Sequence, residues 1–187
     1  ALGVRDTNCH LSGFRSLGAY NNLEKGYVNI STKKGLIGNT YKFPKVTVTG
    51  TSNLIMASVF AKGTNHIKNI SIEPEVIDLI NFLNNSGADI KFLGKRSIKI
   101  TGAKELISGS HTIIGDRIEA FSYLCVGAII NKKIRVNNIN PKYLRTEIGI
   151  LKKIGYKIEI NTNSIQLLPA KKLNPVKIKT GPWPAFA

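Results

Sequence analysis

The sequence contains an internal repeat, and this repeat limits the fold more than any other feature. The unit at 49–102 is patterned as helix, strand, helix, strand, strand. Pro74 fits the first turn of the second helix, and Gly87 accepts the left-handed conformation that follows a last turn. The same order returns later, with Pro141 and Gly155 at the equivalent positions. We therefore expect a fold built from repeated α/β units rather than a solenoid, whose repeats are shorter.

Outside the two full copies, hydrophobic spacing and alternation predict shorter elements. A shortened copy of the unit is expected near the start of the sequence. The additional elements are a helix at 11–17 and strands at 19–22, 26–30, 41–48, 111–114 and 176–180. Pro44 lies inside one of these strands. Because proline cannot donate to a sheet ladder, that strand is expected at a sheet edge or a bulge.

The net charge of +16 is high, and nucleic acid is the usual partner of a chain this basic. The lysines, however, alternate with apolar residues along the expected strands, as at Lys91, Lys99 and Lys157. Alternation of this kind puts them on the solvated faces of sheets. We therefore expect a solvated basic surface. A small anionic ligand and a nucleic acid are the alternatives, in that order.

Several classes of protein do not fit the sequence. It has no run of about 18 apolar residues, so no membrane span is expected. Cys9 and Cys125 lie in unrelated settings, which favours free thiols, with Cys125 buried, and a reducing cytoplasmic location. The histidines show no ligand spacing, so no metal site is expected. No P-loop, dinucleotide fingerprint or GxSxG elbow is present.

Six stretches, in order and at the right spacing, resemble the UDP-N-acetylglucosamine 1-carboxyvinyltransferases. They are GVRDTNCHLSGFRSLGA, EKGYV, FPKVTVTGTSNLIMAS, EPEVIDLINFL with GADI, GDRIEA and TGPWPAF. The resemblance covers essentially the whole chain. It implies inside-out α/β domains made of βαβαββ units, with helices inside and four-stranded sheets outside. Residues 1–114 are then expected to be part of the first domain, and 115–187 part of the second.

The resemblance also implies an activity, which is transfer of the enolpyruvyl group of phosphoenolpyruvate to the 3-hydroxyl of UDP-N-acetylglucosamine. This is the first committed step of peptidoglycan synthesis. The implied partners are these two small molecules, and no metal or organic cofactor is implied. The family's reactive cysteine would lie just before Ala1 and its catalytic aspartate just after Ala187. The chain is therefore expected to be an inactive internal fragment.

Two segments carry the implied substrate site. Arg5 resembles the arginine that clamps the phosphate of phosphoenolpyruvate, and a guanidinium suits this role because it offers two parallel hydrogen bonds. The segment Arg5, Asp6, Thr7, Asn8, Cys9 resembles the one that cradles uracil and ribose. Asp6, Asn8 and Cys9 replace the family's usual proline, aspartate and leucine. An asparagine can still pair with a uracil edge, and Cys9 is not the catalytic cysteine.

The second segment is Lys45, Val46, Thr47 and Val48, which resembles the turn that holds the diphosphate of the nucleotide sugar. Backbone N–H groups at a helix start, together with one lysine, form an anion site by ordinary electrostatics. The helix is expected to begin near Gly50.

Other residues have expected structural roles, and other functions remain as alternatives. Glu73 is expected to act as a charge at a helix N-terminus, and Asp116 and Arg117 to have a structural role at the domain junction. A 5-enolpyruvylshikimate-3-phosphate synthase or an RNA 3′-phosphate cyclase shares the fold, but the RDTN and KVTV stretches favour the UDP-sugar. A non-catalytic basic module for nucleic acid is the alternative from another class, and the sequence leaves the oligomeric state open.

Overall fold

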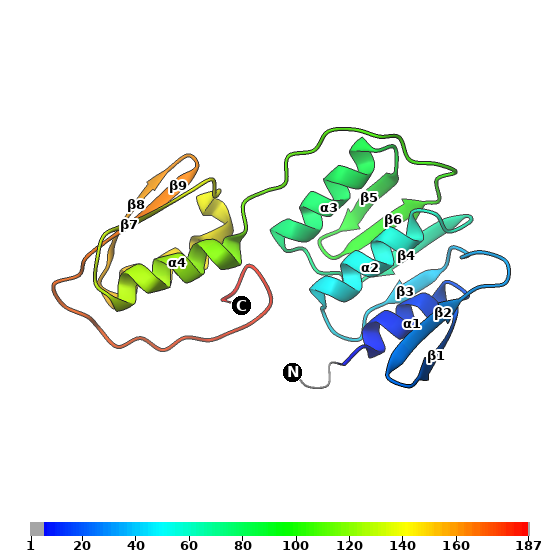
Figure 1. Ribbon diagram of the computed structural model, residues 1–187, viewed down its shortest axis with the longest axis horizontal. Coiled ribbons are helices and arrows are strands. Elements are labelled where there is room, and N and C mark those ends of the chain that lie inside the picture. Colours follow the sequence, from blue (N-terminus) through cyan, green and yellow to red (C-terminus); the bar gives the residue numbers. More distant parts are fainter. Residues whose placement is uncertain (1–5, 187) are drawn as a thin grey trace. The chain divides into compact units, whose positions relative to one another are not determined.

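The computed structural model describes residues 6–186. It divides into two compact units, one ending at His111 and one beginning at Thr112 (Figure 1). No helix within 6–186 is long and apolar enough to cross a membrane. The assignment of 1–114 and 115–187 to two different family domains stays a prediction.

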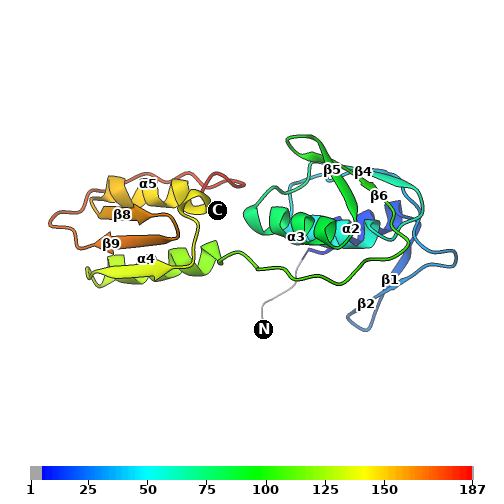
Figure 2. The same cartoon turned by 90° about the horizontal axis from the view of Figure 1, so that it is seen from above.

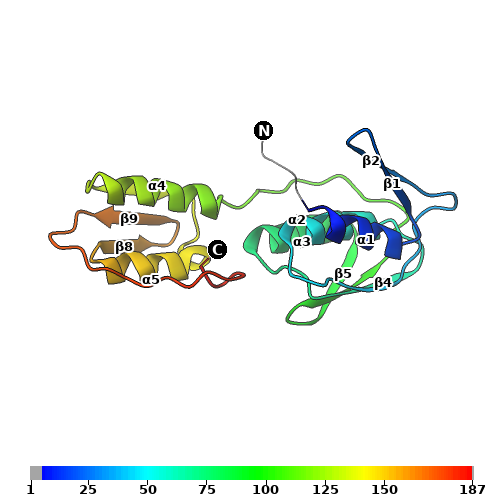
Figure 3. The same cartoon turned by 90° about the horizontal axis from the view of Figure 1, so that it is seen from below.

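The first unit contains a hairpin, a four-stranded sheet and three helices. The elements are α1 (Asn8–Ser16), β1 (Tyr20–Glu24), β2 (Tyr27–Ser31), β3 (Thr40–Lys42), α2 (Val48–Ser58), β4 (Thr64–Lys68), α3 (Pro74–Asn85), β5 (Asp89–Gly94) and β6 (Ser97–Thr101). Strands β1 and β2 pair with each other, and the larger sheet has the order β3-β4-β6-β5. Only the pair β3–β4 in that sheet is parallel. Helices α2 and α3 cover one face of the larger sheet (Figures 2 and 3).

The second unit repeats this arrangement. Its elements are α4 (Arg117–Ile129), β7 (Ile134–Asn137), the 3-10 helix η1 (Pro141–Leu144), α5 (Arg145–Ile154), β8 (Lys157–Asn161) and β9 (Ser164–Leu168). Its sheet has the order β7-β9-β8, which matches β4-β6-β5 of the first unit. In both units the strand between the helices pairs with the last strand of the hairpin. The predicted repeat is therefore confirmed.

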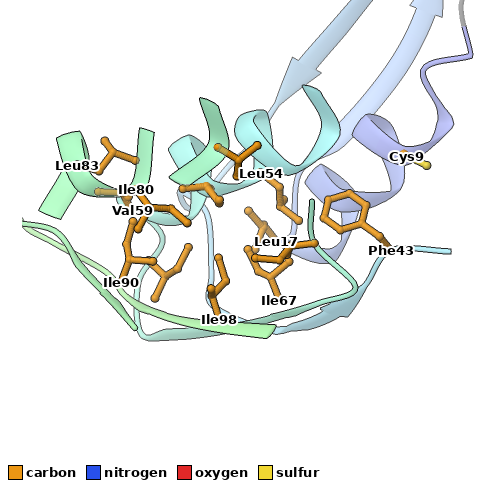
Figure 4. Packing of buried hydrophobic residues seen from close by; sticks show 14 residues of the cluster. Cys9, Leu17, Phe43, Leu54, Val59, Ile67, Ile80, Leu83, Ile90 and Ile98 are labelled. Carbon is orange, nitrogen blue, oxygen red and sulfur yellow. The ribbon is translucent and has the colours of Figure 1, made fainter. Parts of the chain in front are cut away.

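Each unit has its own hydrophobic core. In the first unit, Ile67 on β4 and Ile98 on β6 are fully buried against the helices (Figure 4). Ile100 on β6 is also fully buried. His66 and Lys99 lie between them on the other face, as strand alternation requires. Burying an isoleucine or leucine side chain stabilises a fold by about 1.5–3 kcal/mol. In the second unit, Leu124, Ile165 and Leu167 are equally buried.

The predicted strand at 41–48 is wrong beyond Lys42, where β3 ends. Pro44 has no N–H to donate to a ladder. Thr47 then caps α2, and its Oγ1 accepts a hydrogen bond from the Gly50 N–H at 3.3 Å. The local capping signal therefore outweighs the alternation of apolar residues.

The predicted strands at 111–114 and 176–180 are also wrong. Among the described residues, neither segment joins a sheet, and Thr180 forms only an isolated bridge with Phe186. The His111 side chain contacts Asp78, and Ile113 is 80% exposed. Alternation alone does not make a strand where no partner strand lies alongside.

Helix α1 begins at Asn8, three residues before the predicted start. The Asp6 carboxylate accepts the backbone N–H of Asn8 at 3.0 Å, and the Thr7 carbonyl accepts those of His10 and Leu11. These contacts satisfy N–H groups that a helix start leaves unpaired. The apolar pattern begins later, because Asn8 and His10 are polar, so periodicity could not locate this start.

Candidate functional site

The structure brings the two predicted segments together. Nζ of Lys45 lies 2.8 Å from Oδ2 of Asp6, although the two residues are 39 positions apart in the sequence. Both side chains are exposed, at 64% for Lys45 and 47% for Asp6. The start of α1 and the turn before α2 therefore form one surface. Arg5 lies outside the described residues.

The ion pair changes the titration of both groups. The hydrogen bond from Lys45 is the main cause that lowers the pKa of Asp6, and the Asn8 backbone N–H acts in the same direction. The hydrogen bond to Asp6, and then its negative charge, raise the pKa of Lys45. At neutral pH, Asp6 therefore neutralises the lysine. An anion that binds Lys45 must compete with this carboxylate or displace it.

We expect the Asp6 carboxyl to titrate at a lower pH than an unpaired aspartate, and Lys45→Met to raise its midpoint. Because the pKa is depressed in the folded state, the pair's stabilising effect is present above the unfolded pKa and is lost as the pH falls through the folded one. Carboxyl-carbon NMR would measure both midpoints. Lys91→Met, which removes another exposed lysine, is the control. An unchanged Asp6 midpoint in Lys45→Met would contradict the pairing.

The turn that carries Lys45 is fixed at both ends. On one side, the backbone N–H of Phe43 donates to the Lys68 carbonyl at 3.0 Å, and the Phe43 carbonyl accepts from Nδ2 of Asn69 at 2.8 Å. On the other side, Thr47 caps α2, and its carbonyl accepts the Thr51 hydroxyl at 2.6 Å. Lys45 thus stands just before a helix N-terminus, where backbone N–H groups carry partial positive charge.

His10 lies at the start of α1 beside the candidate site, and the sequence did not predict its contacts. Its Nδ1 lies 2.9 Å from Nδ2 of Asn53, and its Nε2 lies 3.3 Å from Oγ1 of Thr49. His10 therefore joins α1 to the first turns of α2. A glycine at position 13 is the residue in the sequence that indicates a close crossing of α1 and α2. A Cβ at Gly13 would lie 3.2 Å from Cδ1 of Leu54 on α2.

The remaining residues of the first segment differ in exposure. Thr7 and Asn8 are exposed. Cys9 is 5% exposed and belongs to the core of the first unit, where it lies near Phe43 at the α1 end (Figure 4). Its side chain faces the protein interior, so any contact with a ligand would come from its backbone.

Glu73, Asp116 and Arg117 stand at helix starts. Glu73 is buried, accepts the Ser71 hydroxyl and precedes Pro74 of α3. The Asp116 carboxylate caps α4 by accepting the N–H groups of Ile118 and Glu119 at 2.8 and 3.1 Å. Arg117 is buried in the second unit.

Near Arg117, burial raises the pKa of the Glu147 carboxyl, while its own backbone N–H and the Arg117 charge act in the opposite direction. Cys125, which was expected to be buried, is only half-buried, and partial burial raises the pKa of its thiol. No group of three His, Cys, Asp or Glu residues within 6–186 could hold a metal ion.

A cavity of about 400 Å³ lies elsewhere in the first unit. It is lined by the hairpin end and the loop after it, including Tyr20, Lys33, Lys34 and Ile37. Of the predicted substrate-binding residues, those between Asp6 and Val48 that the structure describes do not line it. The candidate site is therefore an exposed surface at the helix starts and does not coincide with this cavity.

The repeated α/β units are those of the enolpyruvyl transferases. The enolpyruvyl transferase NikO from Streptomyces tendae superposes with a TM-score of 0.85 at 20% identity, over 97% of this chain and 46% of that one. An EPSP synthase from Acinetobacter baumannii superposes with a TM-score of 0.66 at 22% identity, over 94% of this chain and 42% of that one. The predicted fold class is confirmed by these structures.

The model of the family EPSP synthase (3-phosphoshikimate 1-carboxyvinyltransferase) matches residues 1–187, so the chain belongs to this family. Relatives named UDP-N-acetylglucosamine 1-carboxyvinyltransferase are 42% identical in Pelagibacter ubique, 41% in Helicobacter acinonychis and 42% in Bartonella quintana. Each match covers 100% of this chain, and the chain spans 44–45% of the length of these relatives. The predicted resemblance is confirmed.

Proposed function

We propose that the protein carrying this chain transfers the enolpyruvyl group of phosphoenolpyruvate to the 3-hydroxyl of UDP-N-acetylglucosamine. The observation that carries the proposal is the printed name of relatives that are 41–42% identical along the whole chain. On this proposal the protein works in the cytoplasm at the start of peptidoglycan synthesis, and thereby affects cell shape and division. It needs two small-molecule substrates and no metal or organic cofactor.

The reaction that this function implies is an addition followed by an elimination. The sugar 3-hydroxyl adds to C2 of phosphoenolpyruvate while C3 gains a proton, which gives a tetrahedral intermediate. Loss of a proton from C3 and of inorganic phosphate from C2 restores the double bond. Cationic groups such as Arg5 would stabilise charge on the phosphate, and acid–base groups would move the protons.

In the proposed site, Lys45 and the N-terminus of α2 hold the diphosphate of UDP-N-acetylglucosamine, with Val46, Thr47 and Val48 supplying the turn. The segment Asp6, Thr7, Asn8 and Cys9 lies against uracil and ribose. The 2.8 Å contact between Lys45 and Asp6 supports the proposal, because it joins the two segments on one surface. Domain boundaries at 114 and 115 are part of the same proposal.

Calorimetric titration of the chain tests this site. UDP-N-acetylglucosamine should bind more tightly than UMP or shikimate 3-phosphate, and Lys45→Met should weaken its binding about 10-fold or more, since a hydrogen bond to a charged group is lost. Lys91→Met should bind as the unchanged chain does.

The same titration, at two salt concentrations, separates the alternatives. Equal and strongly salt-dependent binding of every anion would indicate a non-specific basic surface and contradict the proposed site. The second candidate function is that of an EPSP synthase, which the name of the family favours. Preferential binding of shikimate 3-phosphate would support it.

A further inference from the structure

After β6, the chain runs back along α3 before it leaves the first unit (Figure 1). We call residues 103–111 the strap. The Ala103 N–H donates to the Val59 carbonyl at 2.7 Å, and the Ile107 N–H donates to the Ser86 carbonyl at 2.9 Å. Nε2 of His111 lies 3.1 Å from Oδ1 of Asp78. The strap is thus attached near both ends and in the middle.

The attachment at His111 is largely sheltered from solvent. The side chains of His111 and Asp78 are 16% and 15% exposed, and the His111 ring lies 5.4 Å from that of Phe82. Asp78 and Phe82 are four residues apart on α3 and therefore lie on one face of the helix. One histidine side chain is held by both a carboxylate and an aromatic ring.

Beyond His111, Thr112 and Ile113 are exposed and Ile114 is half-buried. At Gly115 the chain lies against the second unit, where an added Cβ would meet the carbonyl oxygen of Asn138. The free connector between the units therefore consists of residues 112–114 while His111 is attached.

We propose that the contact of His111 with Asp78 and Phe82 is a clasp that sets the length of the connector between the two units. When the clasp opens, the last attachment to the first unit is Ile107. The connector then gains residues 108–111, which is roughly 13 Å of additional reach at full extension. A longer connector lets the units sample a larger volume relative to each other. The inference does not depend on the proposed function.

The contact of His111 with Asp78 and Phe82 can open while the first unit stays folded. Residues 108–110 of the strap are exposed, whereas Ala103 and Leu106 pack against the core. Segments with few buried contacts open locally at a lower free energy than the core does. Release of His111 exposes one side chain and leaves the sheet and the helices unchanged.

Amide hydrogen exchange tests the clasp on the full chain. In Asp78→Ala and in His111→Ala, we expect the Ile107 amide to exchange about 10-fold faster, because Ile107 becomes the last attached residue of the strap and its hydrogen bond to Ser86 then opens more often. The Ala103 amide should be unchanged. Lys91→Ala, which breaks an exposed ion pair of the same unit, should affect neither amide. Equal Ile107 rates in all four proteins would overturn the proposal.

If an alanine variant speeds Ala103 as much as Ile107, the unit as a whole has lost stability. In that case Asp78→Asn distinguishes loss of the clasp from loss of stability of the whole unit, because it keeps the shape of the side chain and removes its charge. If the clasp exists, Asp78→Asn speeds exchange at Ile107 and not at Ala103. If Asp78→Asn does not change the Ile107 rate selectively, the proposal is refuted.

Discussion

Phe43→Ala is expected to lower the free energy of unfolding of the first unit by about 3–5 kcal/mol. Phe43 is fully buried, and its ring packs edge-on against that of Tyr41 at 4.9 Å. Removing the ring costs its transfer free energy and leaves a cavity that the surrounding helices and sheet cannot fill. Urea denaturation followed by circular dichroism measures the change.

Phe60→Ala is the matched control, because it removes the same atoms from a side chain that is 55% exposed. We expect it to cost less than about 1 kcal/mol. Similar losses in the two variants would contradict the assignment of Phe43 to the core. Phe43 also anchors the turn that carries Lys45, so its loss should loosen the candidate site.

Gly102→Ala is expected to destabilise the first unit by about 3 kcal/mol, at the upper end of the range for overpacking. An added Cβ would meet the carbonyl oxygen of Ala61 and would lie 3.4 Å from that of Gly63. Both neighbours are backbone atoms, and the Gly102 N–H is itself bonded to the Gly63 carbonyl at 2.9 Å. Neither a rotamer change nor a small shift can relieve this contact.

Gly149→Ala is the control for the same chemical change. Gly149 lies inside α5, and nothing lies within 4 Å of the position of an added Cβ. Alanine is favoured over glycine in a helix interior by about 0.5–1 kcal/mol, so this variant should be more stable. Gly102→Ala should therefore lower the urea midpoint for unfolding of the first unit, and Gly149→Ala should raise that of the second unit. A neutral Gly102→Ala would show that the backbone there can move.

Much of the fold could be predicted because proline and glycine mark the ends of its elements. Pro74 begins α3 and Pro141 begins η1, while Gly87 and Gly155 adopt positive φ after the helices. The predicted strands that are wrong also carried such residues, with Pro44 inside one of them and Gly115 and Pro175 beside the other two, so these markers alone did not decide whether a strand forms. Whether a segment such as 111–114 joins a sheet depends on a partner elsewhere in the chain, which a local pattern does not contain.

The candidate site was predicted from the resemblance and not from a local pattern, and its role stays a proposal. The turn at Lys45 matched the family, yet its partner Asp6 stands where the family has a proline. The ion pair between them could therefore not be foreseen. His10 was also missed, because its contacts with Asn53 and Thr49 come from another helix. Side-chain pairs that connect distant segments become visible only when the packing of the helices is known.

The most direct test of the account is phosphate release by the complete protein that carries this chain. Phosphoenolpyruvate would be supplied with either UDP-N-acetylglucosamine or shikimate 3-phosphate as the acceptor. The account predicts release of phosphate with UDP-N-acetylglucosamine and none above background with shikimate 3-phosphate. Release with shikimate 3-phosphate alone would contradict it and assign the protein to the other branch of its family.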